Sequence, residues 1–461
     1  MRFAEVDAGG PGARWLSCLL ALSLAAIILI VPGPAEGSTL KSSFSGVDYD
    51  AVAGETNQVT VARSGPNYVF NESGGVAIVA TAPCVNLLAN VAFCPVAGID
   101  SIDVSLLDMN DTASYDASIV APIDTINLTG GPGNDTLLAE GPTGGDLRGN
   151  DGNDTITGGD GDEDVRANAG NDTVVTGVGD DLVFDGPGDD IVSTGPGRDR
   201  LIDDAIANGT DVLDGGEGLG DSMDSRSRTG SLSMSLNGVA DDGEAGEGDN
   251  LIGIEQIDSG SGNDTLTAGS DPVVLRANDG DDVITGGPGP DSLDGGSDDD
   301  TVDGGGGNDF IDGADGSDQL RGNNGDDEFE SGFFDRGADT YGGGAGNDTI
   351  SLDVDFLGRG VIVDLDGVAD DGPVIPVAGI PFDNAGADIE NLVSIAQGQG
   401  GRALPGDDIL TGNGSANQID GGPGNDQISG LGGPDELIGG PGDDELDGGN
   451  GIDGIEGDGG S

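Results

Sequence analysis

The chain has 461 residues, including 91 glycines, 87 aspartates and glutamates, 15 lysines and arginines, and no histidine. Its formal net charge of −72 argues against nucleic acid and anionic membrane surfaces as partners. Without histidine, the chain cannot build a zinc-protease histidine pair, a Ser-His-Asp triad or a Cys-His dyad. Hydrophobic residues make up 34%, below the roughly 45–50% of an ordinary globular domain, so a conventional core is scarce.

The acidic residues are 71 aspartates and only 16 glutamates. Aspartate next to glycine suits tight turns, because it tolerates unusual backbone angles and keeps its carboxylate close to the main chain. This composition favours a protein that binds a hard cation. Intrinsic disorder is the alternative, since high charge and low hydrophobicity are also typical of disordered chains.

The first 37 residues have the features of a secretory signal peptide. An uncharged apolar run covers residues 15–31 and follows Arg2 and Arg14, and small residues precede a cleavage site before Ser38. An uncleaved anchor is the alternative, although 17 residues is at the short limit of the about 17–25 that span a bilayer. We therefore expect an extracellular protein, with attachment to the cell surface as a further possibility, and no membrane span after cleavage.

Residues 38–128 form a different region that we expect to be a β-rich domain or a cap on the repeats that follow. Alternating segments at 58–61, 76–79 and 99–106 predict short strands between Gly, Pro and Asn turns. Cys84 and Cys94 are the two cysteines left after cleavage, and a local disulfide between them is the simplest interpretation in an exported chain.

A nine-residue period begins at Gly130 with the unit GGPGNDTLL. It defines three arrays, at residues 129–224, 259–351 and 403–461, separated by inserts at 225–258 and 352–402. Within a unit, glycines occupy places one, two and four, an aspartate occupies place six, and an aliphatic residue occupies place eight. One buried aliphatic side chain per nine residues is too little apolar area to hold a coil together unaided.

These units resemble the calcium-binding nonapeptides of the RTX family, with the pattern G-G-x-G-x-D-x-U-x. The resemblance implies an all-β fold, a parallel β-roll or β-solenoid in which each unit is a turn followed by a short strand and two units make one coil. It also implies multiple calcium ions, each shared by neighbouring coils and completed by backbone carbonyls of the glycine turns. A single GNDT turn could form without metal. Stacked coils, however, place like carboxylates about 4.8 Å apart, where they repel one another unless a cation lies between them.

The aspartates at place six are the candidate calcium ligands. They are Asp135, Asp154, Asp172, Asp181, Asp190 and Asp199 in the first array, Asp264, Asp282, Asp291, Asp300, Asp309, Asp318, Asp327 and Asp348 in the second, and Asp408, Asp426, Asp435, Asp444 and Asp453 in the third. Glu163, Val273 and Asn417 replace the aspartate in three units, which puts the sites at those turns in doubt.

The two inserts contain similar stretches, at residues 235–243 and 364–372. In both, alternating apolar residues precede an Asn-Gly or Asp-Gly turn, which predicts a β-hairpin that leaves the solenoid and returns to it. A substrate-binding loop is the alternative.

The sequence favours a protein without catalytic activity. Paired carboxylates could serve a glycosidase, but pairs occur at nearly every turn and therefore identify no active site. The single tryptophan, Trp15, lies in the predicted leader, so none remains to stack on sugar rings. We predict a secreted calcium-binding protein whose arrays fold as calcium binds. A calcium-dependent surface adhesin or matrix protein, and a calcium-stabilised module of a secreted hydrolase, are the alternatives.

Overall fold

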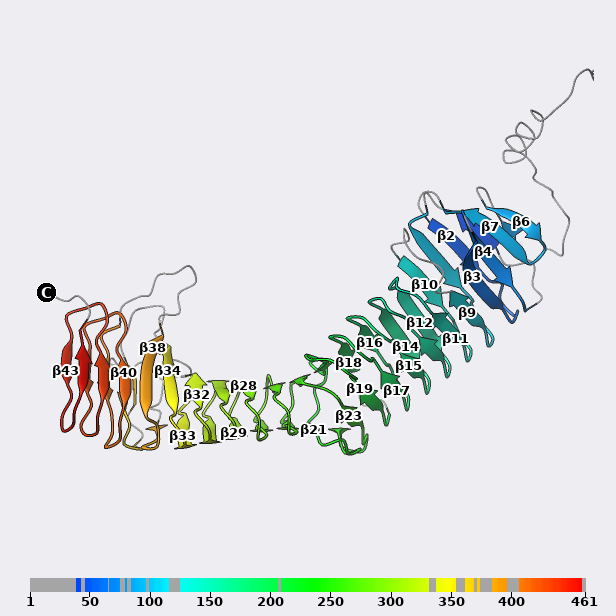
Figure 1. Cartoon of the computed structure of the whole chain (residues 1–461). Helices are drawn as coiled ribbons and strands as arrows, with labels where there is room; N and C mark the ends of the chain where they lie inside the picture. The colour runs from blue at the N-terminus through cyan, green and yellow to red at the C-terminus, as the bar shows by residue number, and fades with distance from the viewer. Residues whose placement is uncertain are drawn as a thin grey trace, which may run out of the picture. The chain divides into compact units, whose positions relative to one another are not determined.

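The computed structural model describes residues 39–42, 46–64, 66–74, 79–80, 84–96, 99–115, 125–205, 209–330, 337–353, 361–368, 371–373, 384–395 and 406–457. All of these belong to the second of two compact units, Ser38–Ser461, and the predicted leader lies outside the described residues. The described residues form strands and turns without a helix, and they therefore contain no helix that could cross a membrane. In Figure 1 the strands of successive coils lie side by side.

One sheet, which we call the continuous sheet, runs through all three arrays and contains 20 strands among the described residues. Its strands are β1 (Thr39–Ser42), β2 (Gly46–Asp50), β5 (Val79–Ala80), β8 (Ser101–Ser105), β10 (Thr125–Thr129), β12 (Asp146–Asp151), β14 (Asp164–Ala169), β16 (Leu182–Phe184), β18 (Arg200–Ile202), β20 (Ser222–Asp224), β24 (Gln256–Asp258), β26 (Val274–Arg276), β28 (Ser292–Ser297), β30 (Phe310–Asp315), β32 (Glu328–Glu330), β34 (Thr349–Asp353), β38 (Asn391–Ile395), β40 (Gln418–Asp420), β42 (Glu436–Ile438) and β44 (Gly454–Glu456).

The other side of the coils is divided into three opposite sheets of 11, 8 and 5 strands in the described part of the chain. The first opposite sheet contains β3 (Gln58–Ser64), β4 (Asn67–Glu72), β6 (Val85–Leu88), β7 (Val91–Pro95), β9 (Thr112–Tyr115), β11 (Thr136–Ala139), β13 (Thr155–Thr157), β15 (Thr173–Val175), β17 (Ile191–Ser193), β19 (Val212–Asp214) and β23 (Asn250–Ile252). The second contains β21 (Leu232–Ser235), β22 (Gly243–Glu244), β25 (Thr265–Thr267), β27 (Val283–Thr285), β29 (Thr301–Gly306), β31 (Gln319–Asn324), β33 (Thr340–Ala345) and β37 (Asn384–Ala385). The third contains β35 (Val361–Asp364), β36 (Gly372–Pro373), β39 (Ile409–Thr411), β41 (Gln427–Ser429) and β43 (Glu445–Asp447).

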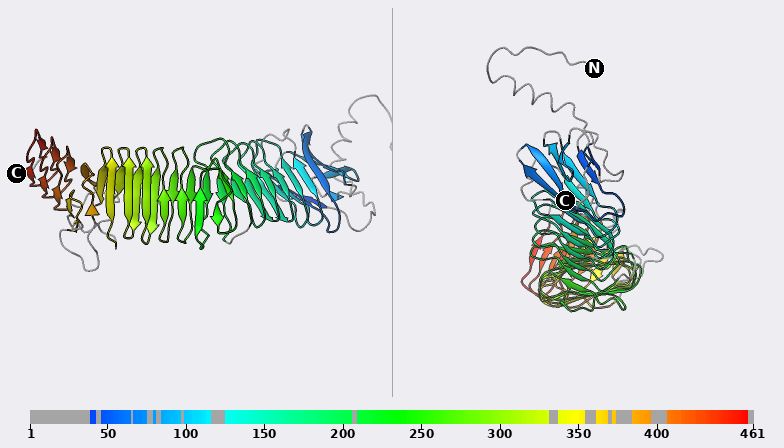
Figure 2. Two further views of the ribbon diagram at one scale, coloured as in Figure 1. Left: turned by 90° about the horizontal axis from the view of Figure 1, so that it is seen from below. Right: turned by 90° about the vertical axis from the view of Figure 1, so that its right-hand side faces the viewer.

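The strand register follows from the nine-residue period. In the arrays each strand pairs in parallel with the strand one coil later, as β13 pairs with β15 by placing Ile156 beside Val174, 18 residues on. Two nonapeptides therefore make one coil, and successive units contribute alternately to the continuous and the opposite sheets (Figure 2). The predicted parallel β-roll is confirmed.

The core of the roll is a column of single side chains. In β30, for example, Ile311 is fully buried whereas its neighbour Phe310 faces outward. Alternation along the strand points the middle residue of a three-residue segment, such as 310–312, into the coil. Each such aliphatic side chain contributes about 1.5–3 kcal/mol on full burial, which is modest for a whole nonapeptide.

The region before the arrays continues both sheets. β2 pairs in parallel with β8 of the continuous sheet, and β3 pairs in parallel with β9 of the first opposite sheet. Beyond β3 the order β3-β4-β7-β6 is antiparallel, and the buried aromatic rings of Tyr49, Tyr68 and Phe70 give this end a fuller core than the coils have. In the structure Cys84 and Cys94 are joined by a disulfide. Of the predicted strand segments, 58–61 lies within β3 and 99–106 contains β8, whereas most of 76–79 lies outside the described residues.

The two inserts interrupt only the opposite side of the roll. At the first insert, β21 and β22 pair antiparallel and β21 starts the second opposite sheet, while β24 continues the continuous sheet between β20 and β26. At the second insert, β35 and β36 pair antiparallel and β35 starts the third opposite sheet, while β38 lies between β34 and β40. The three arrays are therefore parts of one uninterrupted stack.

Candidate metal centre

The place-six aspartates lie in the turns, each directly before a strand. Asp154, for instance, precedes β13, and its side chain is 2% exposed although it is ionisable. All the predicted ligands are buried in this way except Asp444 and Asp453, which lie in the last coils and are partly exposed. Buried carboxylates are rare unless they are paired or bind a metal.

Hydrogen bonds connect these aspartates from coil to coil. The backbone N–H of Asp135 donates to Oδ1 of Asp154 at 2.7 Å, and the N–H of Asp154 donates to Oδ1 of Asp172 at 2.7 Å. We call each such series a carboxylate ladder. The structure brings all the predicted ligands into ladders of this kind, two per array.

The ladders contain the following residues. In the first array they are Asp111, Asp135, Asp154, Asp172, Asp190, Asp211 and Asp249, and Glu163, Asp181, Asp199 and Asp221. In the second array they are Asp264, Asp282, Asp300, Asp318 and Asp339, and Asp291, Asp309, Asp327 and Asp348. In the third array they are Asp408, Asp426 and Asp444, and Asp435 and Asp453.

The second carboxylate oxygen is what suits these turns to a cation. In most of these aspartates Oδ2 is buried and accepts no hydrogen bond from the described protein, as in Asp111, Asp135, Asp154, Asp172, Asp190, Asp221, Asp282, Asp300, Asp309, Asp318, Asp327, Asp348, Asp426 and Asp435. A buried acceptor without a partner costs about 1–3 kcal/mol, and more when it is charged. A bound cation would remove that cost at each of these rungs.

Glycine at place one keeps the space around this oxygen small. A Cβ on Gly322 would lie 2.1 Å from Oδ2 of Asp327, and a Cβ on Gly149 would lie 2.2 Å from Oδ2 of Asp154. Only glycine therefore lets the turn backbone approach the carboxylate this closely. Within the described ranges no three Asp, Glu or Cys side chains converge in a way that could hold a metal by themselves. Because calcium takes 6–8 oxygen ligands, backbone carbonyls would have to supply the rest.

Burial changes the protonation of the ladders when no cation is present. Burial, together with the neighbouring carboxylates of Asp172 and Asp282, raises the pKa of Asp154 to about 7 and that of Asp300 to about 8. The charged form is disfavoured because water is excluded and the nearest charges have the same sign. A divalent cation between the coils would instead favour the charged carboxylates and lower their pKa.

Two of the three departures from the motif satisfy their turns with protein groups. At the Val273 turn, Oδ2 of Asp291 on the next coil accepts a hydrogen bond from the backbone of Gly287 at 2.7 Å. The amide of Asn417 accepts from the backbone of Asn413 at 2.9 Å and donates to the carbonyl of Glu390 at 2.8 Å. These turns therefore have fewer unpartnered oxygens with which to bind a cation than the neighbouring turns have.

Glu163, the third departure, keeps a carboxylate in the ladder. It is 2% exposed, and its backbone N–H donates to Oδ1 of Asp181 at 2.7 Å. Burial raises its pKa to about 9. Its longer side chain occupies the same row as the aspartates.

The nine-residue phase misses five ladder residues, Asp111, Asp211, Asp221, Asp249 and Asp339, of which Asp249 follows Asp211 by 38 residues across the first insert. Three of them follow the previous rung by 21 or 22 residues instead of 18, because their coils contain extra residues, and Asp111 precedes the first regular unit. Each is still followed two positions later by a core residue, such as Leu213 after Asp211. An aspartate two positions before a core residue, sought without a fixed period, would have found them.

A parallel β-roll with rows of buried carboxylates in glycine turns defines a class of protein that binds several hard cations. Its repeats match the family described as RTX calcium-binding nonapeptide repeat (4 copies), at residues 144–174, 166–201, 258–293, 276–311, 294–329, 335–350, 402–428 and 421–455. The chain therefore carries RTX calcium-binding nonapeptide repeats in these ranges, and repeats of this family are structural units that bind multiple calcium ions. No curated protein matches the chain.

Proposed function

We propose that this chain is a secreted, non-catalytic calcium-binding protein whose arrays fold when calcium binds outside the cell. In this proposal the leader 1–37 is removed, residues 38–128 cap the roll, and the three arrays joined by inserts 225–258 and 352–402 hold the ions. The buried Oδ2 atoms of the carboxylate ladders are the observation that carries the proposal, because their negative charge has no protein partner.

The place-six aspartates are the ligands that we propose. Their Oδ1 atoms bind the backbone of the preceding coil, so that calcium at Oδ2 would link adjacent coils. Sites of the class typical of extracellular modules, with dissociation constants of about 10⁻⁴–10⁻³ M, would fill at extracellular calcium concentrations. Binding free energy then becomes folding free energy.

Far-ultraviolet circular dichroism of the chain without its leader tests the proposal. In chelator we expect the spectrum of a largely disordered chain, because like charges repel and the core is small. Addition of calcium should produce the strand spectrum. Calcium-dependent folding would be contradicted if the spectrum in chelator were the same as the spectrum in about 10 mM calcium, which is roughly ten times the extracellular level.

A calcium-dependent adhesin or matrix protein is the second candidate, and one surface favours it. The strand β6, at the edge of the first opposite sheet, exposes Leu87 and Leu88 by 63% and 64%. Residues 73–99 around it contain no charged residue, in a chain of net charge −72. Retention on the producing cells in calcium and release in chelator would support this candidate, whereas release in both would support a free calcium-binding protein.

A further inference from the structure

Arg228 is a buried cation at the junction of the first two arrays. Its side chain is 1% exposed, and it is the sole lysine or arginine in the buried part of the described chain. The guanidinium donates to Asp203 through two bonds, from Nε to Oδ2 at 2.9 Å and from Nη2 to Oδ1 at 2.6 Å. It also donates from Nη1 to Oε1 of Glu247 at 3.0 Å.

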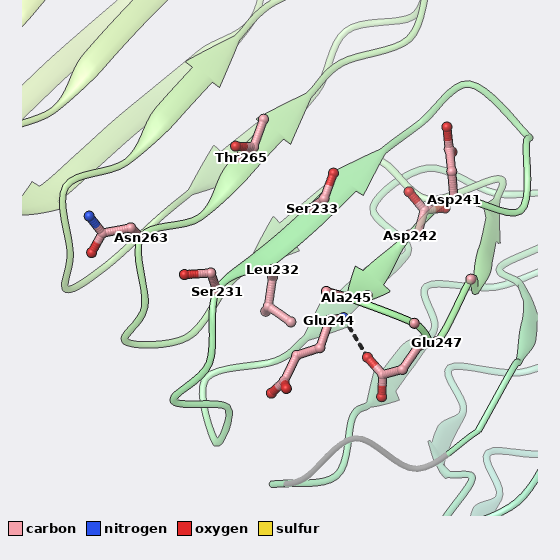
Figure 3. Close-up of a pocket in the computed structure, with 13 residues that line it drawn as sticks. Ser231, Leu232, Ser233, Asp241, Asp242, Glu244, Ala245, Glu247, Asn263 and Thr265 are labelled. Carbon is pink, nitrogen blue, oxygen red and sulfur yellow. Dashed lines mark hydrogen bonds between the residues drawn. The ribbon is translucent and has the colours of Figure 1, made fainter.

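These contacts join three parts of the chain. Asp203 follows β18 in the first array, Glu247 lies in the first insert, and the carbonyl of Arg228 accepts a hydrogen bond from Ser261 in the second array at 3.0 Å. Figure 3 shows the neighbouring pocket of the insert, where the backbone N–H of Glu244 donates to Oε2 of Glu247. Both oxygens of Glu247 and both oxygens of Asp203 therefore accept hydrogen bonds from the protein.

In the hairpin of the insert, both oxygens of a buried aspartate also accept hydrogen bonds from the protein. Oδ1 of Asp242 accepts from the backbone of Ser235 at 2.6 Å, and its Oδ2 accepts from the backbone of Leu251 at 3.0 Å. The matching residue of the second insert, Asp371, likewise accepts from two backbone groups, of Asp364 and Ala385, each at 2.7 Å. The ladder aspartates differ, because in most of them only Oδ1 accepts a hydrogen bond from the described protein.

We propose that Arg228 supplies at this junction the positive charge that calcium supplies in the arrays, so that Asp203 and residues 225–251 form a clamp that stays folded without calcium. A guanidinium is suited to this position because it is permanently charged and matches a carboxylate with two parallel bonds. The clamp holds the end of the first opposite sheet next to the start of the second. The arrays would then fold outward from a junction that is already in register.

Hydrogen exchange of the chain without its leader, followed by mass spectrometry in chelator, tests the clamp. We expect peptides from 221–258 to exchange at least about tenfold more slowly than peptides from 277–330, because a clamp held by protein groups opens less often than an array without its ions. Arg228→Met should remove this difference, since it leaves two buried carboxylates without their cation. Arg276→Met is the control, because Arg276 is 41% exposed and pairs with Asp258 at 3.1 Å on the surface.

The inference rests on calcium-dependent folding of the arrays, and the same experiment separates the two ideas. Arrays protected in chelator as well as in calcium would contradict the proposed function. Arrays that require calcium, together with an insert as unprotected as they are in chelator, would overturn the clamp alone. An Arg228→Met chain with unchanged insert protection would also overturn it.

A second pair of variants covers the case in which Arg228→Met prevents folding even in calcium. Arg228→Lys keeps the charge but loses the paired contact with Asp203, and Asp203→Asn keeps the shape but loses the charge. We expect both to lower the protection of 221–258 in chelator and to leave the protection of 277–330 in calcium unchanged. Unchanged insert protection in both variants would overturn the clamp.

Discussion

At the scale of single residues, the two carboxylate oxygens of most place-six aspartates have different surroundings. Oδ1 of Asp327 accepts the backbone N–H of Asp309 at 2.9 Å, whereas its Oδ2 is buried without a protein donor. The hydrogen bond to Oδ1 fixes the stacking of the coils, and Oδ2 leaves a negative charge to be compensated. A neutral side chain of the same shape separates these two roles.

We predict that Asp327→Asn lowers the number of bound calcium ions by about one or two, since neighbouring coils would share an ion and ligand charge sets calcium affinity. The amide oxygen can still accept the hydrogen bond from Asp309. Asp326→Asn is the matched control, because Asp326 is the adjacent exposed residue and the change in net charge is the same. Isothermal titration calorimetry measures the stoichiometry. Equal losses in both variants would mean that only net charge matters.

The glycine at place one gives a second prediction. A Cβ on Gly322 would meet Oδ2 and Cγ of Asp327 at 2.1 and 2.7 Å, so Gly322→Ala should displace the carboxylate and raise the calcium concentration at the folding midpoint. At Gly342 the nearest atom to a new Cβ is the carbonyl oxygen of Leu320, at 3.9 Å. Gly342→Ala should therefore leave the midpoint unchanged or lower it, by up to about 1 kcal/mol of added stability. Calcium titrations followed by circular dichroism compare the two, and similar midpoints would show that the close approach has no effect on binding.

At the scale of the strand, each nonapeptide adds one side chain to the core. We predict that Ile311→Ala in β30 costs about 2–5 kcal/mol and raises the calcium concentration needed for folding, because binding and folding are coupled. Phe310→Ala is the control on the same strand, since Phe310 faces outward and is 37% exposed. Circular dichroism titrations report both midpoints. A larger shift for Phe310→Ala than for Ile311→Ala would contradict the inward assignment.

The coil could be predicted from the sequence because its contacts recur at a regular interval along the chain. A unit and its counterpart 18 residues later meet in every turn, so the repeat predicts both the strand register and the buried positions of Ile156 and Val174. The place-six ligands follow from the same period. Predictions of this kind need no knowledge of contacts between distant segments.

The path of the chain through the inserts could not be predicted in this way. There the ladders are carried on by glutamates, as Oε2 of Glu255 accepts the backbone N–H of Asp221 at 3.0 Å and Oε2 of Glu390 accepts that of Asp348 at 3.1 Å. The two residues of each pair are 34 and 42 positions apart, so a search for a nine-residue phase does not relate them. The longer side chain reaches the neighbouring coil where the backbone has left the regular path. The contacts of Arg228 with Asp203 and Glu247 also depend on distant segments.

At the scale of the whole molecule, the net charge of −72 has two parts with different physical consequences. Exposed carboxylates repel one another through water, and salt screens this repulsion. The buried Oδ2 atoms of the ladders are shielded from salt as well as from water, so their cost persists at any ionic strength. Calcium acts on both parts, whereas a monovalent salt acts only on the first.

We therefore predict that sodium chloride cannot replace calcium. At about 1 M salt the screening length falls to about 3 Å, which removes most repulsion between exposed charges. The ladders still lack partners for Oδ2, so the circular dichroism spectrum in salt and chelator should remain that of a largely disordered chain. Calcium of about 1 mM, added in the same salt, should restore the strand spectrum. Magnesium should be less effective, because it demands near-octahedral geometry and gives up its water reluctantly. Full strand signal in sodium chloride alone would show that calcium acts only by screening, and the buried oxygens would then need another explanation.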